Sequence, residues 1–89
     1  MGIKLWLPSR LYGIAKRKLV YEVKGKTVGE CVDHLVRVIP EIKKALFYKA
    51  GETLHPYVKV RVNEESADAE GLAKKVKEGD EIHLMMNMS

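Results

Sequence analysis

Apolar and polar residues alternate along four stretches of the chain, residues 3–7, 19–24, 57–63 and 81–86. A period of two predicts half-buried β-strands at each of them. The clearest stretch is "YVKVRVN", in which valine recurs at every second position. In the first and last stretches, the apolar residues expected to face inward are Ile3, Leu5, Leu7, Ile82, Leu84 and Met86.

Between the second and third stretches the period changes to that of a helix. Thr27 is a favoured N-cap residue and Glu30 follows three positions later, which is the pattern of a capping box. We expect the helix to end before Pro40, because the residue preceding a proline is disfavoured in a helix. A further helical turn is expected within residues 40–47. The apolar positions expected to face inward in both helical segments are Val28, Val32, Leu35, Ile39, Ile42, Leu46 and Phe47.

The predicted order is strand, strand, helix, strand, strand. One helix covers only one face of a sheet, so the other face should stay open. We therefore predict an α+β fold in one domain over residues 1–89, with a four- to five-stranded mixed sheet and one main helix on one face. Parallel pairing of the first and last strands at the centre would make it a ubiquitin-like β-grasp. Residues 8–18, 48–56 and 64–71 are expected to be loops, and residues 72–80 a short helical or extended segment that ends in a turn at Gly79 and Asp80.

The composition of the chain argues against membrane and nucleic-acid-binding proteins. Eighty-nine residues with 46% hydrophobic and 31% charged content are typical of one soluble globule. No apolar run approaches the roughly 20 residues of a membrane helix, and the N-terminus lacks a signal peptide pattern, so we expect a cytoplasmic protein with no membrane partner. The net charge of +4 is spread over small basic groups, and nucleic-acid binding is disfavoured because aromatic residues do not cluster with them.

The sequence offers no catalytic constellation. Cys31 and His34 are three residues apart, but Cys31 borders the apolar side of the predicted helix, where a cysteine behaves as a small core residue. The three histidines fall on different elements, and metal-binding or phosphate-binding motifs are absent. We expect no catalytic residue, no metal site, no cofactor and no enzyme activity of the chain itself.

The open face of the predicted sheet is the remaining candidate site. Trp, Met and Arg are enriched at protein–protein interfaces, and this face should carry all three. The predicted partner interface consists of Trp6, Lys4, Lys59, Arg61, His83 and Met85. The alternative is that residues 8–18 fold back over this face and bury Trp6.

Several stretches, taken in order, resemble the small ubiquitin-like sulfur carriers, namely the small subunit of molybdopterin synthase and the thiamine-pathway carrier. "IKLWLPSRLYGI" resembles the family's first strand and its Arg-containing loop. "KTVGECVDHLVRVIPEIKKAL" resembles its helix and the "P-E-L" that follows. "VKVRVNEE" is similar to the next strand, and "VKEGDEIHLMM" to the last turn and strand. The length matches the molybdopterin type better than the shorter thiamine type.

The resemblance implies a carrier that is adenylated on its C-terminal carboxyl by an E1-like enzyme and then bears sulfur as a thiocarboxylate. It also implies a large synthase subunit as partner. Family members end in Gly-Gly, whereas the last glycine here is Gly79 and the carrier position would fall on Ser89. Either the natural tail extends or differs at this point, or the chain is a β-grasp protein-binding module that has lost carrier chemistry and binds another protein. An RNA-binding β-grasp domain is the third and least favoured alternative.

Overall fold

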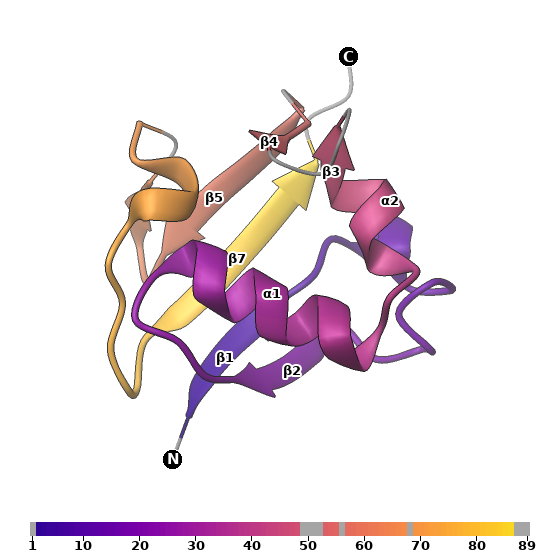
Figure 1. The fold of residues 1–89 in the computed structure, drawn as a ribbon, viewed down its shortest axis with the longest axis horizontal. Coiled ribbons are helices and arrows are strands. Elements are labelled where there is room, and N and C mark those ends of the chain that lie inside the picture. Colours follow the sequence, from indigo (N-terminus) through magenta and orange to yellow (C-terminus); the bar gives the residue numbers. More distant parts are fainter. Residues whose placement is uncertain (1, 49–52, 56, 68, 87–89) are drawn as a thin grey trace.

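The structure is a computed structural model that describes residues 2–48, 53–55, 57–67 and 69–86. The helices are η1 (Ser9–Leu11), α1 (Val28–Val38), α2 (Ile42–Leu46) and η2 (Gly71–Ala73). The strands are β1 (Ile3–Trp6), β2 (Val20–Val23), β3 (Phe47–Tyr48), β4 (Thr53–Leu54), β5 (Val58–Val62), β6 (Glu65–Ser66) and β7 (Glu81–Met86). Figure 1 shows α1 lying across one face of the main sheet.

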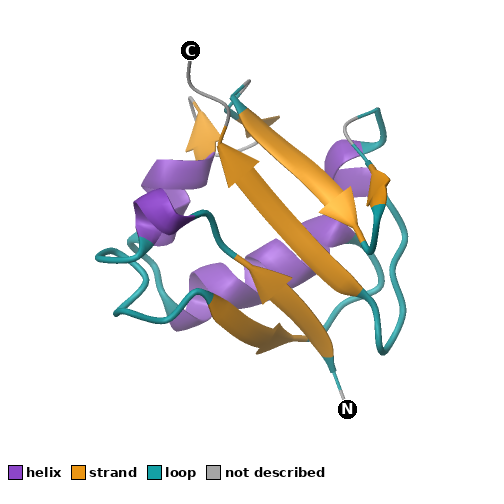
Figure 2. Cartoon of the chain, turned by 180° about the vertical axis from the view of Figure 1, so that it is seen from behind, coloured by secondary structure: helices purple, strands orange, loops and turns teal. Residues whose placement is uncertain are grey.

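The main sheet has five strands in the order β2-β1-β7-β5-β6. Its central pair, β1 and β7, is parallel, and the other neighbouring pairs are antiparallel. Seen from behind, the face opposite α1 carries no helix in its middle (Figure 2). The predicted ubiquitin-like β-grasp, with a mixed sheet and one main helix on one face, is therefore confirmed.

The capping box explains where α1 begins. The Thr27 hydroxyl oxygen accepts a hydrogen bond from the Glu30 N–H at 3.2 Å, as predicted. The Glu30 carboxylate reaches back one residue further than in the standard motif, accepting from the Lys26 N–H at 3.0 Å. The helix ends at Val38, directly before the C-cap residue Ile39 and Pro40, again as predicted.

The core lies between α1 and the inner face of the sheet. The alternating apolar residues of β1, β5 and β7 that face α1 are buried there, except that Met86, which was expected to face inward, is only partly buried. α1 contributes Val28, Cys31, Val32 and Leu35 from one side. α2 closes the end of this layer with Ile42 and Leu46, both fully buried. Burial of this apolar set is the dominant stabilising term of the fold.

The short elements η1, β3, β4 and β6 were not predicted, whereas η2 overlaps the start of the short helical or extended segment expected over residues 72–80. The 48–56 connection contains β3 and β4, which pair as a two-stranded ladder. Within 64–80, β6 pairs with the end of β5, and the chain then forms the short helix η2. This stretch crosses beside the start of α1, where the Val28 N–H donates to the Lys74 carbonyl at 2.9 Å. Elements of two or three residues are too short to show a period, which is why the sequence pattern misses them.

Candidate functional site

Strand register brings the predicted interface residues onto the open face. Trp6 on β1 lies opposite His83 on β7, and Arg61 on β5 lies opposite the same histidine. One step along, Lys59 lies opposite Met85. Alternate residues of a strand share a face, so these side chains form two adjacent rows across the sheet. Trp6 and Met85 are 37% and 38% exposed, which is high for large apolar side chains.

Lys4, the remaining member of the predicted interface, lies on the same face near the start of β1. It is exposed and lies between two glutamates in the ladder, Glu22 on β2 and Glu81 on β7. Opposite charges on directly neighbouring strands attract each other across the ladder. The positive charge of this face is therefore partly offset around Lys4, whereas Lys59 and Arg61 lie on the other side of β7.

A three-residue cluster fixes the conformation of the exposed tryptophan. The rings of Trp6 and His83 are stacked, with centroids 5.4 Å apart and planes 10° from parallel. The Trp6 indole N–H donates a hydrogen bond to Oε1 of Glu81 at 3.0 Å. His83 Nε2 lies 3.7 Å from the same carboxylate oxygen. Glu81 thus anchors the Trp6 ring, on which the His83 ring stacks, and Glu81 was absent from the interface residues predicted from the sequence.

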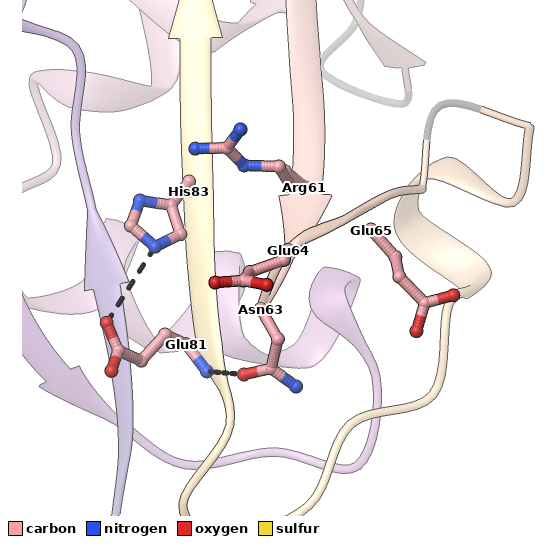
Figure 3. Close-up of a pocket in the computed structure, with 6 residues that line it drawn as sticks. All are labelled: Arg61, Asn63, Glu64, Glu65, Glu81 and His83. Carbon is pink, nitrogen blue, oxygen red and sulfur yellow. Dashed lines mark hydrogen bonds and ion pairs between the residues drawn. The ribbon is translucent and has the colours of Figure 1, made fainter.

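An open depression adjoins this cluster on the β5–β6 side. It is lined by Arg61, Asn63, Glu64, Glu65, Glu81 and His83 (Figure 3). Asn63 begins the turn between β5 and β6 with φ +57°, and its side-chain oxygen accepts from the Glu81 N–H at 3.0 Å. The depression is polar and mixes three carboxylates with one guanidinium and one imidazole, which suits contact with a protein surface better than an apolar ligand.

The loop of residues 8–18 does not cover the open face. Two of its apolar residues, Leu11 and Ala15, are instead buried in the core, 4% and 0% exposed. Trp6 stays exposed beside it, so the alternative in which the loop buries this tryptophan is wrong. The predicted carrier position, Ser89, lies outside the described residues.

Cys31 and His34 do not form a nucleophile–base pair. Burial, with a smaller contribution from the negative charge of Glu30, raises the pKa of the Cys31 thiol to about 11. His34 instead accepts a hydrogen bond at Nδ1 from the Lys24 N–H at 2.9 Å. Within the described ranges, His, Cys, Asp and Glu side chains make no group of three suited to a metal ion. No helix there is long and apolar enough to cross a bilayer.

Comparison with known proteins decides the family. A sequence model of the ThiS family matches residues 7–89. The chain belongs to the ThiS family. Its members are ubiquitin-like sulfur carriers, as the resemblance in the sequence implied. A search among curated protein sequences found no match.

Solved structures place this ThiS-family chain among similar small proteins. A chain of the Amycolatopsis orientalis BexX/CysO complex is 28% identical, with a TM-score of 0.89 over 99% of this chain and 98% of that one. The small archaeal modifier protein 1 of H. volcanii is 30% identical, with a TM-score of 0.78 over 97% of each chain. CysO of Mycobacterium tuberculosis, at 21% identity and a TM-score of 0.86, shares the fold over 98% of this chain and 100% of its own.

The two faces of the sheet in this ThiS-family chain differ. α1 covers one face, and the opposite face carries no helix in its middle (Figure 2). β7 runs through the middle of the sheet and ends at Met86, opposite Val58. Residues 84–86 extend past the ladder that β1 forms with β7 at residues 81–83. The last described residues of the chain therefore belong to the central strand of the sheet.

Proposed function

We propose that this chain is a cytoplasmic sulfur carrier that bears sulfur as a thiocarboxylate at its C-terminus, as the small subunit of a molybdopterin synthase. An E1-like enzyme would adenylate the terminal carboxylate, releasing pyrophosphate, and a sulfur donor would then displace AMP. The observation that carries the proposal is the family match over residues 7–89. The fold is consistent with it, because β7 presents the following residues from the centre of the sheet.

The chain would contribute a carboxylate and a docking surface, and the partner enzymes would contribute the catalysis. We propose that the open face is that surface, with Trp6, Lys4, Lys59, Arg61, His83 and Met85 in contact with the activating enzyme and the large synthase subunit. Trp6 supports this because a large aromatic side chain that is held rigid and partly exposed loses little entropy on binding.

Intact mass spectrometry tests the carrier function. The protein, expressed to its natural stop codon, is incubated with the activating enzyme of the same organism, ATP and sulfide. We expect a mass gain equal to the exchange of one oxygen for one sulfur, and no gain without ATP or with a C-terminal extension. If the unmodified mass persists under all conditions, the carrier function is wrong and a binding module that lost this chemistry becomes the better interpretation.

Replacement of the central tryptophan tests the docking surface. Trp6→Ala should weaken binding to the activating enzyme by about 10-fold or more, because exposed aromatic anchors dominate interface energies. Val38→Ala serves as a matched control, since Val38 is an apolar residue that is 49% exposed on α1, away from the open face. Equal affinity of Trp6→Ala and the unmodified chain would place the interface elsewhere.

A further inference from the structure

The loop between β1 and β2 holds the whole net charge of the chain. Residues 8–19 contain Arg10, Lys16, Arg17 and Lys18 and no acidic residue. The net charge is +4, so the remaining basic residues of the chain are balanced by its 12 acidic residues. Such an imbalance in a short segment favours a positive potential around the loop.

Two exposed apolar side chains lie within this basic loop. Tyr12 is 48% and Ile14 is 41% exposed, and both lie between Arg10 and the three consecutive basic residues that follow. Tyrosine and arginine are typical anchors of protein interfaces, and isoleucine adds apolar area. The loop therefore combines long-range attraction with short-range contacts.

The backbone of the loop is held in an unusual conformation. Lys16 and Arg17 have φ values of +56° and +63°, in the left-handed region that residues other than glycine rarely adopt. The Arg17 N–H donates to the Tyr12 carbonyl at 2.8 Å, and the Lys18 N–H donates to the Ala15 carbonyl at 3.1 Å. The left-handed conformation costs about 1 kcal/mol or more per residue, and the surrounding contacts offset this cost.

The core anchors the base of the same loop. Leu11 and Ala15 are buried, and the Tyr21 hydroxyl of β2 donates a hydrogen bond to the Ala15 carbonyl at 2.7 Å. The Lys18 ammonium lies 4.9 Å from the centre of the Tyr21 ring, a distance suited to a cation–π contact. The basic and apolar side chains are thus presented on a preorganised support, which lowers the entropy lost on binding.

The loop and the end of β7 lie at the same end of the sheet. β1 and β7 are parallel, and the chain enters the loop where β1 ends and continues toward the C-terminus where β7 ends. In Figure 2 both arrowheads point in the same direction. A protein that receives the C-terminus of this chain must therefore approach the end at which the basic loop projects.

We propose that this loop is a second docking element, in which Tyr12, Ile14, Lys16 and Arg17 bind an acidic surface with an apolar recess on the enzyme that activates the C-terminal carboxyl. The inference rests on the carrier function proposed above. A discrete protein surface is favoured over RNA, because the loop has one aromatic residue and no row of stacking rings. It is favoured over a membrane, because two apolar side chains offer little area for insertion into lipid.

Neutralisation of two charges without disturbing the backbone tests the proposal. Asparagine tolerates the left-handed region, so Lys16→Asn with Arg17→Asn removes the charge and leaves the loop conformation accessible. The matched control is Lys75→Asn with Lys77→Asn, two exposed lysines in the segment that precedes β7, at the opposite end of the sheet. Both double variants have the same net charge, and their urea midpoints verify that they are folded.

The measurement is kcat/KM for thiocarboxylate formation by the activating enzyme of the same organism at two salt concentrations. At low ionic strength the loop variant should be slower by about 10-fold, and the control by less than about twofold. At about 1 M salt the difference between the two should largely vanish, because the Debye length falls to about 3 Å. Tyr12→Ser with Ile14→Ser should lower kcat/KM by about fivefold at both salt concentrations.

The outcomes separate this inference from the carrier function. If the unmodified chain is never activated, the carrier function fails and the docking element fails with it. If the chain is activated but the loop variant matches the lysine control, the loop has no docking role. A third outcome starts from an unmodified chain that binds a 20-nucleotide RNA with about micromolar affinity, or that binds phosphatidylserine vesicles. If the loop variant loses that binding but is activated at an unchanged rate, the partner of the loop is RNA or a membrane and the proposed protein partner is wrong.

Discussion

The turn after β5 depends on Asn63, and its replacement should destabilise the protein through two separable effects. The Asn63 side chain donates from Nδ2 to Oδ1 of Asp80 at 3.2 Å and accepts from the Glu81 N–H at 3.0 Å. Its backbone has φ +57°. These contacts hold the start of β7 beside the end of β5, where the Asn63 N–H also donates to the Glu81 carbonyl at 2.7 Å.

Two substitutions divide the stabilisation between side chain and backbone. Each exposed side-chain hydrogen bond contributes about 0.5–1 kcal/mol, and alanine at positive φ costs about 1 kcal/mol more. Asn63→Ala should therefore lower the free energy of unfolding by about 2–3 kcal/mol. Asn63→Gly loses the same side-chain bonds but adopts positive φ without strain, so its loss should be about 1–2 kcal/mol.

Urea unfolding monitored by Trp6 fluorescence and by circular dichroism measures both variants. The midpoints should fall in the order unmodified chain, Asn63→Gly, Asn63→Ala, with unchanged slopes. Equal midpoints for the two variants would show that the left-handed backbone imposes no cost here. A glycine variant as stable as the unmodified chain would show that the bonds to Asp80 and Glu81 contribute nothing.

The other predictions concern the core, the cysteine and the helix cap. Leu35→Ala should cost about 2–5 kcal/mol in urea unfolding, because Leu35 is fully buried, whereas Val38→Ala should change stability by less than about 0.5 kcal/mol. The Cys31 thiol should resist alkylation at pH 8 in the native state and react once urea unfolds the chain; rapid native reaction would contradict its burial. Folding raises the pKa of Cys31 from 9.0 to about 11, so the folded state binds the thiol proton more tightly than the unfolded state. The free energy of unfolding should therefore decrease as the pH rises from 9 to 11, and it should decrease less in Cys31→Ala. An equal pH dependence of the free energy of unfolding in both proteins would refute this prediction. Thr27→Ala should cost about 1 kcal/mol and Thr27→Ser much less, since serine preserves the bond to the first turn of α1; equal losses would exclude the cap as the cause.

Local patterns were sufficient for the main elements. The alternation in "VKVRV" predicts β5, and the Thr27–Glu30 pair marks the start of α1 within one residue. Both signals involve residues that are close in the chain, so the alternation of the strand and the first hydrogen bonds of the helix can be predicted from the sequence alone. The face of each strand follows from the same period, which is why the predicted members of the open face do lie together.

Contacts within the open face depended on the tertiary structure. The bond from Trp6 to Glu81 joins residues 75 positions apart, and it exists only because β1 pairs with β7 in one particular register. A shift by one residue would turn every side chain of a strand to the other face. The alternation of residues 81–86 places Glu81 on the same side as His83, but its hydrogen bond to Trp6 follows only from the register of β1 and β7.

The sequence by itself determined the strands and helix, the family, and the concentration of net charge between residues 8 and 19. These features are set by composition and by neighbours along the chain. The tertiary structure decided that this basic loop is anchored through Leu11 and Ala15 and lies at the end of the sheet where β7 ends. Spatial neighbourhood of that kind arises from the burial of a shared core and the parallel pairing of distant strands, which no local pattern encodes.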